Sequence, residues 1–310
     1  MSMNTVQSGH DSLTGLLQEY GEQAVQQAGP RRWKLAFGDG AADRAFAAEG
    51  GDWLTLDAPW PGRRRSAHPR SLWAYLECNK ALAGGAKLVL TGKDRLPRIR
   101  VDVPVEEGLC SAKAIRAAAR ALRAAIHCIG KAGQAGPCAP EAGDADPQAC
   151  DLEELCTSSG WPFARRAGGA LSVRLESLGA THHASLTTCA RGVSAAVHLA
   201  VCDALGAGAC QALAVCLLTA SGLVRMARAT AARQEDGRTV LGFEVVLDVP
   251  ATAQQLDRGL CALSVACGLY GPREIAALQD ERMAERYLAI RGWASNRMRQ
   301  EPLIRKGLHR

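Results

Sequence analysis

The chain has few aromatic residues and lacks the short motifs by which most cofactor and metal sites are recognised. Aromatic residues make up 5% of its 310 positions and hydrophobic residues 47%, so a core must be built mainly from aliphatic side chains and alanine. The sequence contains no Walker-type phosphate loop, dinucleotide-binding glycine fingerprint, Gly-x-Ser-x-Gly elbow or His-Glu-x-x-His pair. We therefore expect no cofactor, no metal and no catalytic residues, and a protein that is not an enzyme.

Cysteine is abundant, yet its spacing predicts neither a zinc site nor a disulfide framework. None of the twelve cysteines belongs to a Cys-x-x-Cys pair. Most of them lie in apolar runs, where a free thiol packs as a small hydrophobic side chain. The first twenty residues are polar and have no signal-peptide core. We expect reduced, structural thiols and a location in the bacterial cytoplasm.

Positive charge is concentrated at the C-terminal end. The formal net charge is +6, and residues 281–310 hold eight Lys/Arg against three Glu, which is +5 in this segment alone. The rest of the chain is therefore close to neutral. A basic tail of this kind is typical either of a solvated end or of an interaction arm.

One uncharged stretch is long enough to cross a membrane. Residues 204–224 contain no charged side chain, but they include three glycines and several polar residues. We interpret them as the end of a helix, a turn, a buried strand and a hairpin turn. No membrane association is expected.

The second half of the chain resembles a diverged copy of the first. Residues 99–104 read Ile-Arg-Val-Asp-Val-Pro and residues 245–250 read Val-Val-Leu-Asp-Val-Pro, and a helical pattern follows each. Weaker echoes pair Leu90-Thr91 with Leu218-Thr219, and Cys78-Asn79 with Cys202-Asp203. Both helical patterns place apolar residues at spacings of 4, 3, 4 and 3, as on one buried helix face. These are Ile115, Ala119, Leu122, Ile126 and Ile129, and Leu256, Leu260, Leu263, Cys267 and Tyr270.

The expected fold is α+β with antiparallel sheets, as a tandem duplication of helix, three strands, helix, two or three strands, helix. The first domain is assigned to residues 1–130, with helices at 13–24 and 72–83. A linker rich in Gly and Pro covers 131–150, and the second domain covers 151–271, with a helix at 193–205 and strands at 211–219, 223–231 and 239–249. Residues 272–310 form an amphipathic helix, with Ile275, Leu278, Met283, Tyr287 and Ile290 on one face, and the basic tail.

A basic loop is the best candidate for an interaction site. It contains Trp60, Arg63, Arg64, Arg65 and Arg70 between predicted strands and a helix. Such a cluster is able to bind phosphate, an acidic peptide or RNA. It is equally interpretable as a solvated connection, and the second copy has no counterpart.

The order of elements resembles that of the small type III secretion chaperones and of the related YbjN-like domains of bacteria. The resemblance is one of topology and size over both copies, and it implies a compact α+β unit that pairs with a second unit. It implies no catalytic residue. Two copies in one chain depart from the single-domain form of that family.

We therefore expect a non-enzymatic protein-binding protein, a chaperone or scaffold, that is a monomer whose two domains pair as an internal pseudo-dimer. The partner's identity is not predicted. Two alternatives remain open. The first is a nucleic-acid-associated protein that uses the Arg-rich loop and the C-terminal arm, and the second is an enzyme with a site between the domains.

Overall fold

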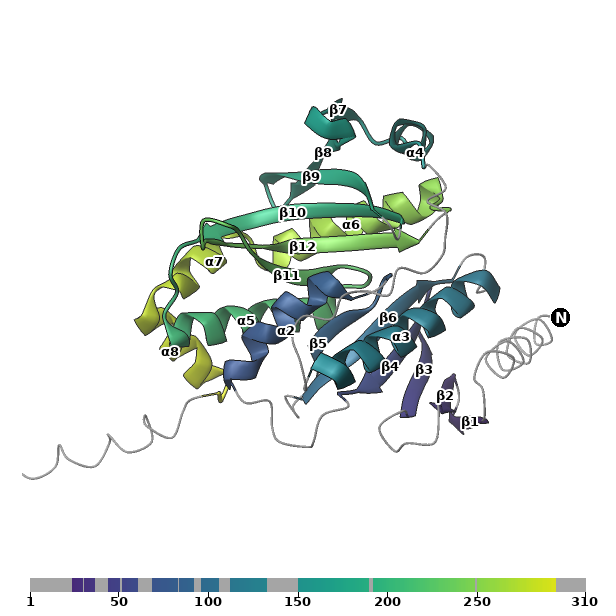
Figure 1. The fold of residues 1–310 in the computed structure, drawn as a ribbon, viewed down its shortest axis with the longest axis horizontal. Coiled ribbons are helices and arrows are strands. Elements are labelled where there is room, and N and C mark those ends of the chain that lie inside the picture. Colours follow the sequence, from purple (N-terminus) through teal and green to yellow (C-terminus); the bar gives the residue numbers. More distant parts are fainter. Residues whose placement is uncertain are drawn as a thin grey trace, which may run out of the picture.

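The computed structural model describes residues 24–29, 31–36, 44–50, 52–60, 69–82, 84–91, 96–105, 112–132, 150–189, 192–248 and 250–293. These residues form two six-stranded antiparallel sheets with helices packed against them (Figure 1). The predicted α+β class with two sheet-containing halves is confirmed.

The first half is built on a sheet in the order β1-β2-β3-β4-β6-β5, and α3 packs across β4 and β6. Its elements are β1 (Ala24–Gly29), β2 (Arg32–Ala36), β3 (Arg44–Gly50), β4 (Trp53–Pro59), α2 (Pro69–Ala81), β5 (Lys87–Thr91), β6 (Leu96–Pro104) and α3 (Ala112–Ala132).

The second half repeats this arrangement in the order β7-β8-β9-β10-β12-β11, and α6 packs across β8, β9, β10 and β12. Its elements are α4 (Leu152–Ser159), β7 (Phe163–Arg165), a 3-10 turn (Ala167–Gly169), β8 (Leu171–Ser177), β9 (Ala180–Cys189), β10 (Gly192–Cys202), α5 (Ala207–Leu223), β11 (Arg228–Arg233), β12 (Thr239–Asp248) and α6 (Ala253–Leu269). Two further helices follow, α7 (Pro272–Gln279) and α8 (Glu281–Ile290).

The duplication therefore holds at the level of topology, but the predicted number of strands was wrong. Among the described residues, four strands precede α2 in the first half and α5 in the second half, and two strands follow each of these helices. In the first half, β1 occupies residues 24–29, where the end of the first predicted helix and its stop were placed. In the second half, no extra strand follows α5.

Two neighbouring segments of the second half exchange the structures predicted for them. Residues 193–205, predicted as a helix, lie largely in strand β10, and residues 211–219, predicted as a strand, lie within helix α5. Alanine favours helices, but Val193, Ala195 and Val197 alternate on the buried face of β10. Helix α5 packs against α2, β5, β11, α7 and α8, so it needs no polar face and shows no amphipathic period.

The two Asp-Val-Pro motifs occur at the ends of β6 and β12, which are equivalent strands, but they do not occupy equivalent positions in those strands. Pro104 of β6 lies opposite Trp53, the first residue of β4, whereas Asp248 of β12 lies opposite Gly192, the first residue of β10. The two motifs are thus two residues out of register. The weaker echoes do not join equivalent elements, because they pair β5 with α5 and α2 with the end of β10.

The two helices with 4-3-4-3 spacing form as predicted, as α3 and α6. Thr252 begins α6 with a capping box, in which its hydroxyl accepts from the Gln255 N–H and the Gln255 side chain accepts from the Thr252 N–H. Ile115, Leu122 and Ile129 of α3 are buried. Helix α3 buries these side chains against the first sheet, and the opposite face of α3 is exposed to solvent.

The single amphipathic helix predicted after residue 272 is two helices. Asp280 separates α7 from α8, and its carboxylate accepts a hydrogen bond from the Met283 N–H at 2.9 Å. Ile275 is buried as predicted, but Met283 and Ile290 are 47% and 77% exposed. The predicted linker at 133–149 and the basic tail after residue 293 lie outside the described residues.

Candidate functional site

The two halves meet along a seam formed by α2 and β5 of the first half and by α5 and β11 of the second. Helix α2 packs on β11, α5 packs on β5, and the two helices pack on each other between the sheets (Figure 1). Each half thus offers the same pair of elements to the other, as in an isologous dimer interface. At Gly222 of α5, a Cβ atom would lie 2.7 Å from the Leu90 carbonyl oxygen, so glycine permits this close approach of α5 to β5.

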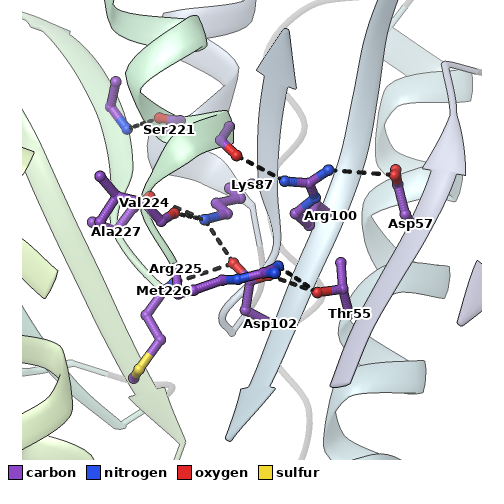
Figure 2. Close-up of polar contacts among 12 residues, drawn as sticks. Thr55, Asp57, Lys87, Arg100, Asp102, Ser221, Val224, Arg225, Met226 and Ala227 are labelled. Atoms are coloured by element: carbon purple, nitrogen blue, oxygen red, sulfur yellow. Dashed lines mark hydrogen bonds and ion pairs between the residues drawn. The ribbon is translucent and has the colours of Figure 1, made fainter. Parts of the chain in front are cut away.

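A buried ion pair lies at the centre of the seam (Figure 2). Lys87, the first residue of β5, places its Nζ 2.7 Å from Oδ2 of Asp102 on β6, and both side chains are 0% exposed. The same Nζ donates to the Val224 carbonyl at 2.6 Å and to the Ala227 carbonyl at 3.3 Å. Both carbonyls belong to the segment after α5, so Lys87 ties the first half to the second.

The Asp102 carboxylate also accepts from the second half. Arg225 Nη1 lies 3.0 Å from Asp102 Oδ1 and donates to Thr55 Oγ1 at 2.5 Å, and the Met226 N–H donates to Asp102 Oδ2 at 3.1 Å (Figure 2). Met226 has a φ of 59°, a conformation that is unfavourable for a non-glycine residue. The contact with Asp102 holds this strained turn in place.

Burial and charge act on these two groups in opposite directions. Burial lowers the pKa of Lys87 below its ordinary value, although the adjacent Asp102 charge and hydrogen bond act to raise it. Burial acts to raise the pKa of Asp102, but the Lys87 charge and hydrogen bond, with the charges of Arg225 and Arg100, outweigh burial and hold that pKa below its ordinary value.

A reciprocal cluster completes the seam. Arg228, the first residue of β11, is paired with Glu244 of β12 at 2.8 Å, and Ser194 donates to the same carboxylate at 2.7 Å. Arg228 Nη1 donates to three carbonyls that follow α2. These belong to Leu82, Gly84 and Ala86, at 3.0, 3.3 and 3.2 Å. Each half therefore supplies a cation to the other half: Lys87 binds carbonyl groups that follow α5, and Arg228 binds carbonyl groups that follow α2. The dipole of each helix is negative at this end.

The two clusters, centred on the Lys87–Asp102 and Arg228–Glu244 pairs, align the two halves. Their charges are paired within the protein, and each cation also bonds to the other half. A buried ion pair contributes little net stability, yet it penalises any arrangement that separates its partners. Sequence reasoning missed these residues. The available signal was Lys87 itself, a single cation between Ala86 and a run of three apolar residues in a predicted strand.

The sequence-predicted interaction residues are not assembled into a site in the described part of the chain. Trp60 follows β4, its ring centroid lies 4.3 Å from that of Tyr75 on α2, and it is only partly exposed. Arg63, Arg64 and Arg65 lie outside the described residues. Arg70 lies within α2, and its side chain is outside the described part. The Arg-rich loop therefore stays a prediction.

A second surface, which sequence reasoning also missed, is an exposed apolar strip on the second half. It consists of Leu178, Cys261, Val265 and Leu269, and we refer to it as the apolar strip. Leu178 is 88% exposed, Val265 55% and Leu269 44%, and Cys261 is also exposed. The three α6 residues are spaced four apart, so they share one face of the helix. The signal in the sequence was the absence of any charged residue between 259 and 270.

The hairpin that carries Leu178 is fixed against α6. Ser264 of α6 donates to the Glu176 carbonyl at 2.7 Å. A Cβ atom at Gly268 would lie 2.4 Å from Ser177 Oγ and 3.4 Å from Leu178 Cδ1, so glycine allows the tip of the hairpin to rest on the helix. The turn therefore holds Leu178 beside Gly268 of α6, next in sequence to Leu269.

The described cysteines are free thiols with one exception. Cys128 is disulfide-bonded, and it is the described cysteine that departs from the expectation of reduced thiols. Burial raises the pKa of the Cys156 thiol to about 11 and those of Cys216 and Cys267 to about 12. These three thiols are therefore held in the protonated, unreactive form at neutral pH.

No group of three His, Cys, Asp or Glu among the described residues is placed to hold a metal ion. None of the helices that the structure describes is long and apolar enough to cross a membrane, α5 included.

Comparison with known proteins returned no relative. No protein-family model matches the chain, and neither a curated protein nor a solved structure is significantly similar to it.

Proposed function

We propose that this protein is a non-enzymatic protein-binding protein, a chaperone or scaffold, whose partner docks on the apolar strip. The class is the one that the resemblance of the predicted element order to type III secretion chaperones implied. The apolar strip carries the proposal, because exposed aliphatic side chains that share a rigid surface are typical of protein–protein interaction sites.

Leu178 destabilises the hairpin turn between β8 and β9 in which it lies. Leu178 and Gly179 occupy a two-residue hairpin turn with φ values of 45° and 78°. Positive φ at both positions favours Asn-Gly, and a leucine there costs about 1 kcal/mol relative to asparagine. Because the side chain is 88% exposed, its burial does not offset this cost. A residue that weakens the turn and is offered to solvent is best explained by a contact made in a complex.

The partner expected at this surface is a polypeptide segment with aliphatic side chains. The apolar strip carries no charge, so ionic contacts at its centre would be left unpaired. Leu178, Val265 and Leu269 provide the aliphatic anchors that such a segment would cover. Binding through this surface should persist at high salt, because it depends on apolar burial.

The decisive experiment separates folding from binding with Leu178→Asn. This substitution should raise the free energy of unfolding by up to about 1 kcal/mol, because asparagine tolerates the turn, and it should abolish capture of the partner. The chain and its variant are compared as bait in the native host's extract at 1 M salt, and any stoichiometric partner is then purified and its binding is measured directly. Leu223→Asn is the matched control, since Leu223 is 65% exposed at the end of α5, away from the apolar strip.

Three results would contradict the proposal: a partner that binds Leu178→Asn as well as the parent chain, a partner lost equally in Leu223→Asn, or no stoichiometric partner at all. A homodimer that dissociates in Leu178→Asn would also contradict it, by showing that the apolar strip joins two copies of this chain.

The seam supports a further part of the proposal, that the chain is a monomer with its two halves paired internally. The linker predicted from the sequence has about 19 residues, and a flexible chain of that length spans roughly 25 Å, so each half is expected to meet the other at a millimolar effective concentration. Internal pairing leaves α2, β5, α5 and β11 covered, and light scattering should then give the mass of one chain. A stable dimer that persists in Leu178→Asn would argue against internal closure.

A further inference from the structure

Two exposed histidines lie opposite each other on neighbouring strands of the second sheet. The antiparallel ladder between β9 and β10 pairs Ala184 with Val197, so the adjoining residues, His183 and His198, face each other across the two strands. Directly opposed residues of such a ladder point to the same face of the sheet, with Cβ atoms about 4.5–5.5 Å apart. Both histidines are exposed. We refer to them as the histidine pair.

The histidine pair lies on the face of the sheet that is turned away from α6. A Cβ atom at Gly259 of α6 would lie 3.0 Å from Val245 Cγ1, so Val245 points toward α6. Val245 pairs with Ala195 of β10, and His198 lies three residues further along that strand. Because side chains alternate between the two faces, His198 and the opposed His183 point the other way. The sheet therefore separates the histidine pair from α6.

The surroundings of the histidine pair leave its ring nitrogens available. On its other side, His198 lies opposite Gly242 of β12, which has no side chain. A Cβ atom at Gly242 would clash with the Val197 carbonyl oxygen, so glycine is required there and the space beside His198 stays open. Within the part of the chain that the structure describes, neither imidazole forms a hydrogen bond or an ion pair.

One charged side chain lies directly beside the histidine pair. Arg174 of β8 is opposite His183, and its guanidinium is held by Glu176 at 2.6 and 2.7 Å. The Glu176 charge offsets that of Arg174, which weakens the repulsion of a cation bound at His183. The Glu176 carboxylate also accepts from the Thr181 hydroxyl at 3.2 Å. It is therefore engaged by two donors and is not available as a further ligand.

The fold does not require histidine at these two positions. The described strands of the first sheet, which repeats the topology of the second, contain no histidine. His182, the neighbour of His183 in sequence, is 8% exposed and pairs with buried Leu175. It points to the opposite face of the sheet, so the histidine that His183 meets is His198 and not the adjacent residue.

We infer that the histidine pair binds a divalent transition-metal ion, with Cu²⁺ preferred over Ni²⁺ and Zn²⁺. Neutral imidazole is the commonest metal ligand in proteins, and it suits these three ions, whereas Mg²⁺ and Ca²⁺ prefer oxygen ligands. The order of affinity follows the general order for nitrogen ligands, in which Cu²⁺ binds most tightly. No group of three ligating residues occurs among the described residues, so the two imidazoles are the protein ligands and water fills the remaining positions.

The test titrates Cu²⁺, Ni²⁺ and Zn²⁺ into the full chain at pH 7.5 by isothermal calorimetry. The exposed Cys189 and Cys261 are alkylated beforehand, so that thiols do not compete for the metal. His183→Gln and His198→Gln each remove one imidazole and keep a polar side chain on the exposed face. The matched control is His127→Gln, which removes an exposed histidine of α3.

We expect each single variant to lose Cu²⁺ affinity by at least about 10- to 100-fold, the loss typical of removing even an outer-shell partner of a metal ligand. The double variant should lose little more, because one remaining imidazole is unable to chelate. His127→Gln should bind as the parent does, and excess Mg²⁺ should not displace Cu²⁺. Electron paramagnetic resonance of the Cu²⁺ complex should show coupling to two imidazole nitrogens.

The inference is overturned if the parent chain binds none of the three ions, if either single substitution leaves the affinity unchanged, or if His127→Gln loses as much. Displacement by Mg²⁺, or coupling to one imidazole nitrogen only, would also overturn it. Leu178→Asn should bind Cu²⁺ as the parent does, so these outcomes are independent of those for the apolar strip.

Discussion

Replacing Asp102 by asparagine is the most direct test of the seam, because it removes one charge from a fully buried pair and changes the shape little. Lys87 would keep the Val224 and Ala227 carbonyls but lose Asp102, its anionic partner among the described residues, at 2.7 Å. Removing one member of a buried pair typically costs about 3–5 kcal/mol, since the other charge stays buried without compensation. Asp102→Asn should lower the free energy of unfolding by this amount.

The reciprocal substitution should cost less. In Lys87→Met, Asp102 keeps Arg225 and the Met226 N–H as partners, so its charge remains compensated. In the double variant no lysine is left unpaired, and its cost should fall short of the sum of the two single costs by more than about 1 kcal/mol. Urea unfolding followed by tryptophan fluorescence measures all three variants.

The pH dependence provides a second measurement on the same variants. Because the folded pKa of Asp102 is lowered, its stabilising contribution is present above its unfolded pKa and is lost as pH falls through the folded pKa. For Lys87 the folded pKa is also lowered, so stability rises with pH between that value and the ordinary one. Asp102→Asn removes the influence that raises the Lys87 pKa, and its deficit relative to the parent should shrink as pH increases.

An exposed ion pair is the control for these experiments. Arg174 and Glu176 lie 2.6 Å apart with side chains 66% and 58% exposed, and breaking this pair should cost no more than about 1 kcal/mol. The reasoning is refuted if Asp102→Asn costs as little as the surface control. It is equally refuted if the costs of Asp102→Asn and Lys87→Met are additive in the double variant.

Two further predictions rest on close packing. Gly222→Ala should destabilise the chain by about 1 kcal/mol or more in the same urea assay, although alanine favours helices, because the new Cβ meets the Leu90 carbonyl at 2.7 Å; an increase in stability would contradict the close approach of α5 to β5. Alkylation with iodoacetamide at pH 7.5 and mass spectrometry should modify exposed Cys189 in the folded protein, while Cys216 reacts only after unfolding and Cys128 only after reduction. Rapid labelling of Cys216 in the folded chain would show that its site is open.

Local pattern was sufficient where an element has one buried and one solvated face. Helix α3 and strand β9 each show the periodicity of their class, because only one side of each meets the core. A repeated motif disclosed the duplication, because Asp-Val-Pro occurs at the end of the equivalent strands β6 and β12. The strand pairings show that the two motifs differ in register by two residues.

The sequence by itself determined that the chain is α+β, that its second half repeats the first, and where the amphipathic helices α3 and α6 lie. The tertiary structure decided the identity of β10 and α5, because α5 is covered on all sides and therefore lost the period that marks a helix. The tertiary structure also decided which residues form the seam between the halves and which residues form the apolar strip. Lys87 and Asp102 lie on the adjacent strands β5 and β6, but the Val224 carbonyl and the Met226 N–H that complete their cluster lie 137 and 124 residues along the chain. Leu178 likewise meets Gly268 of α6 across the length of the second half, and no local pattern encodes such contacts.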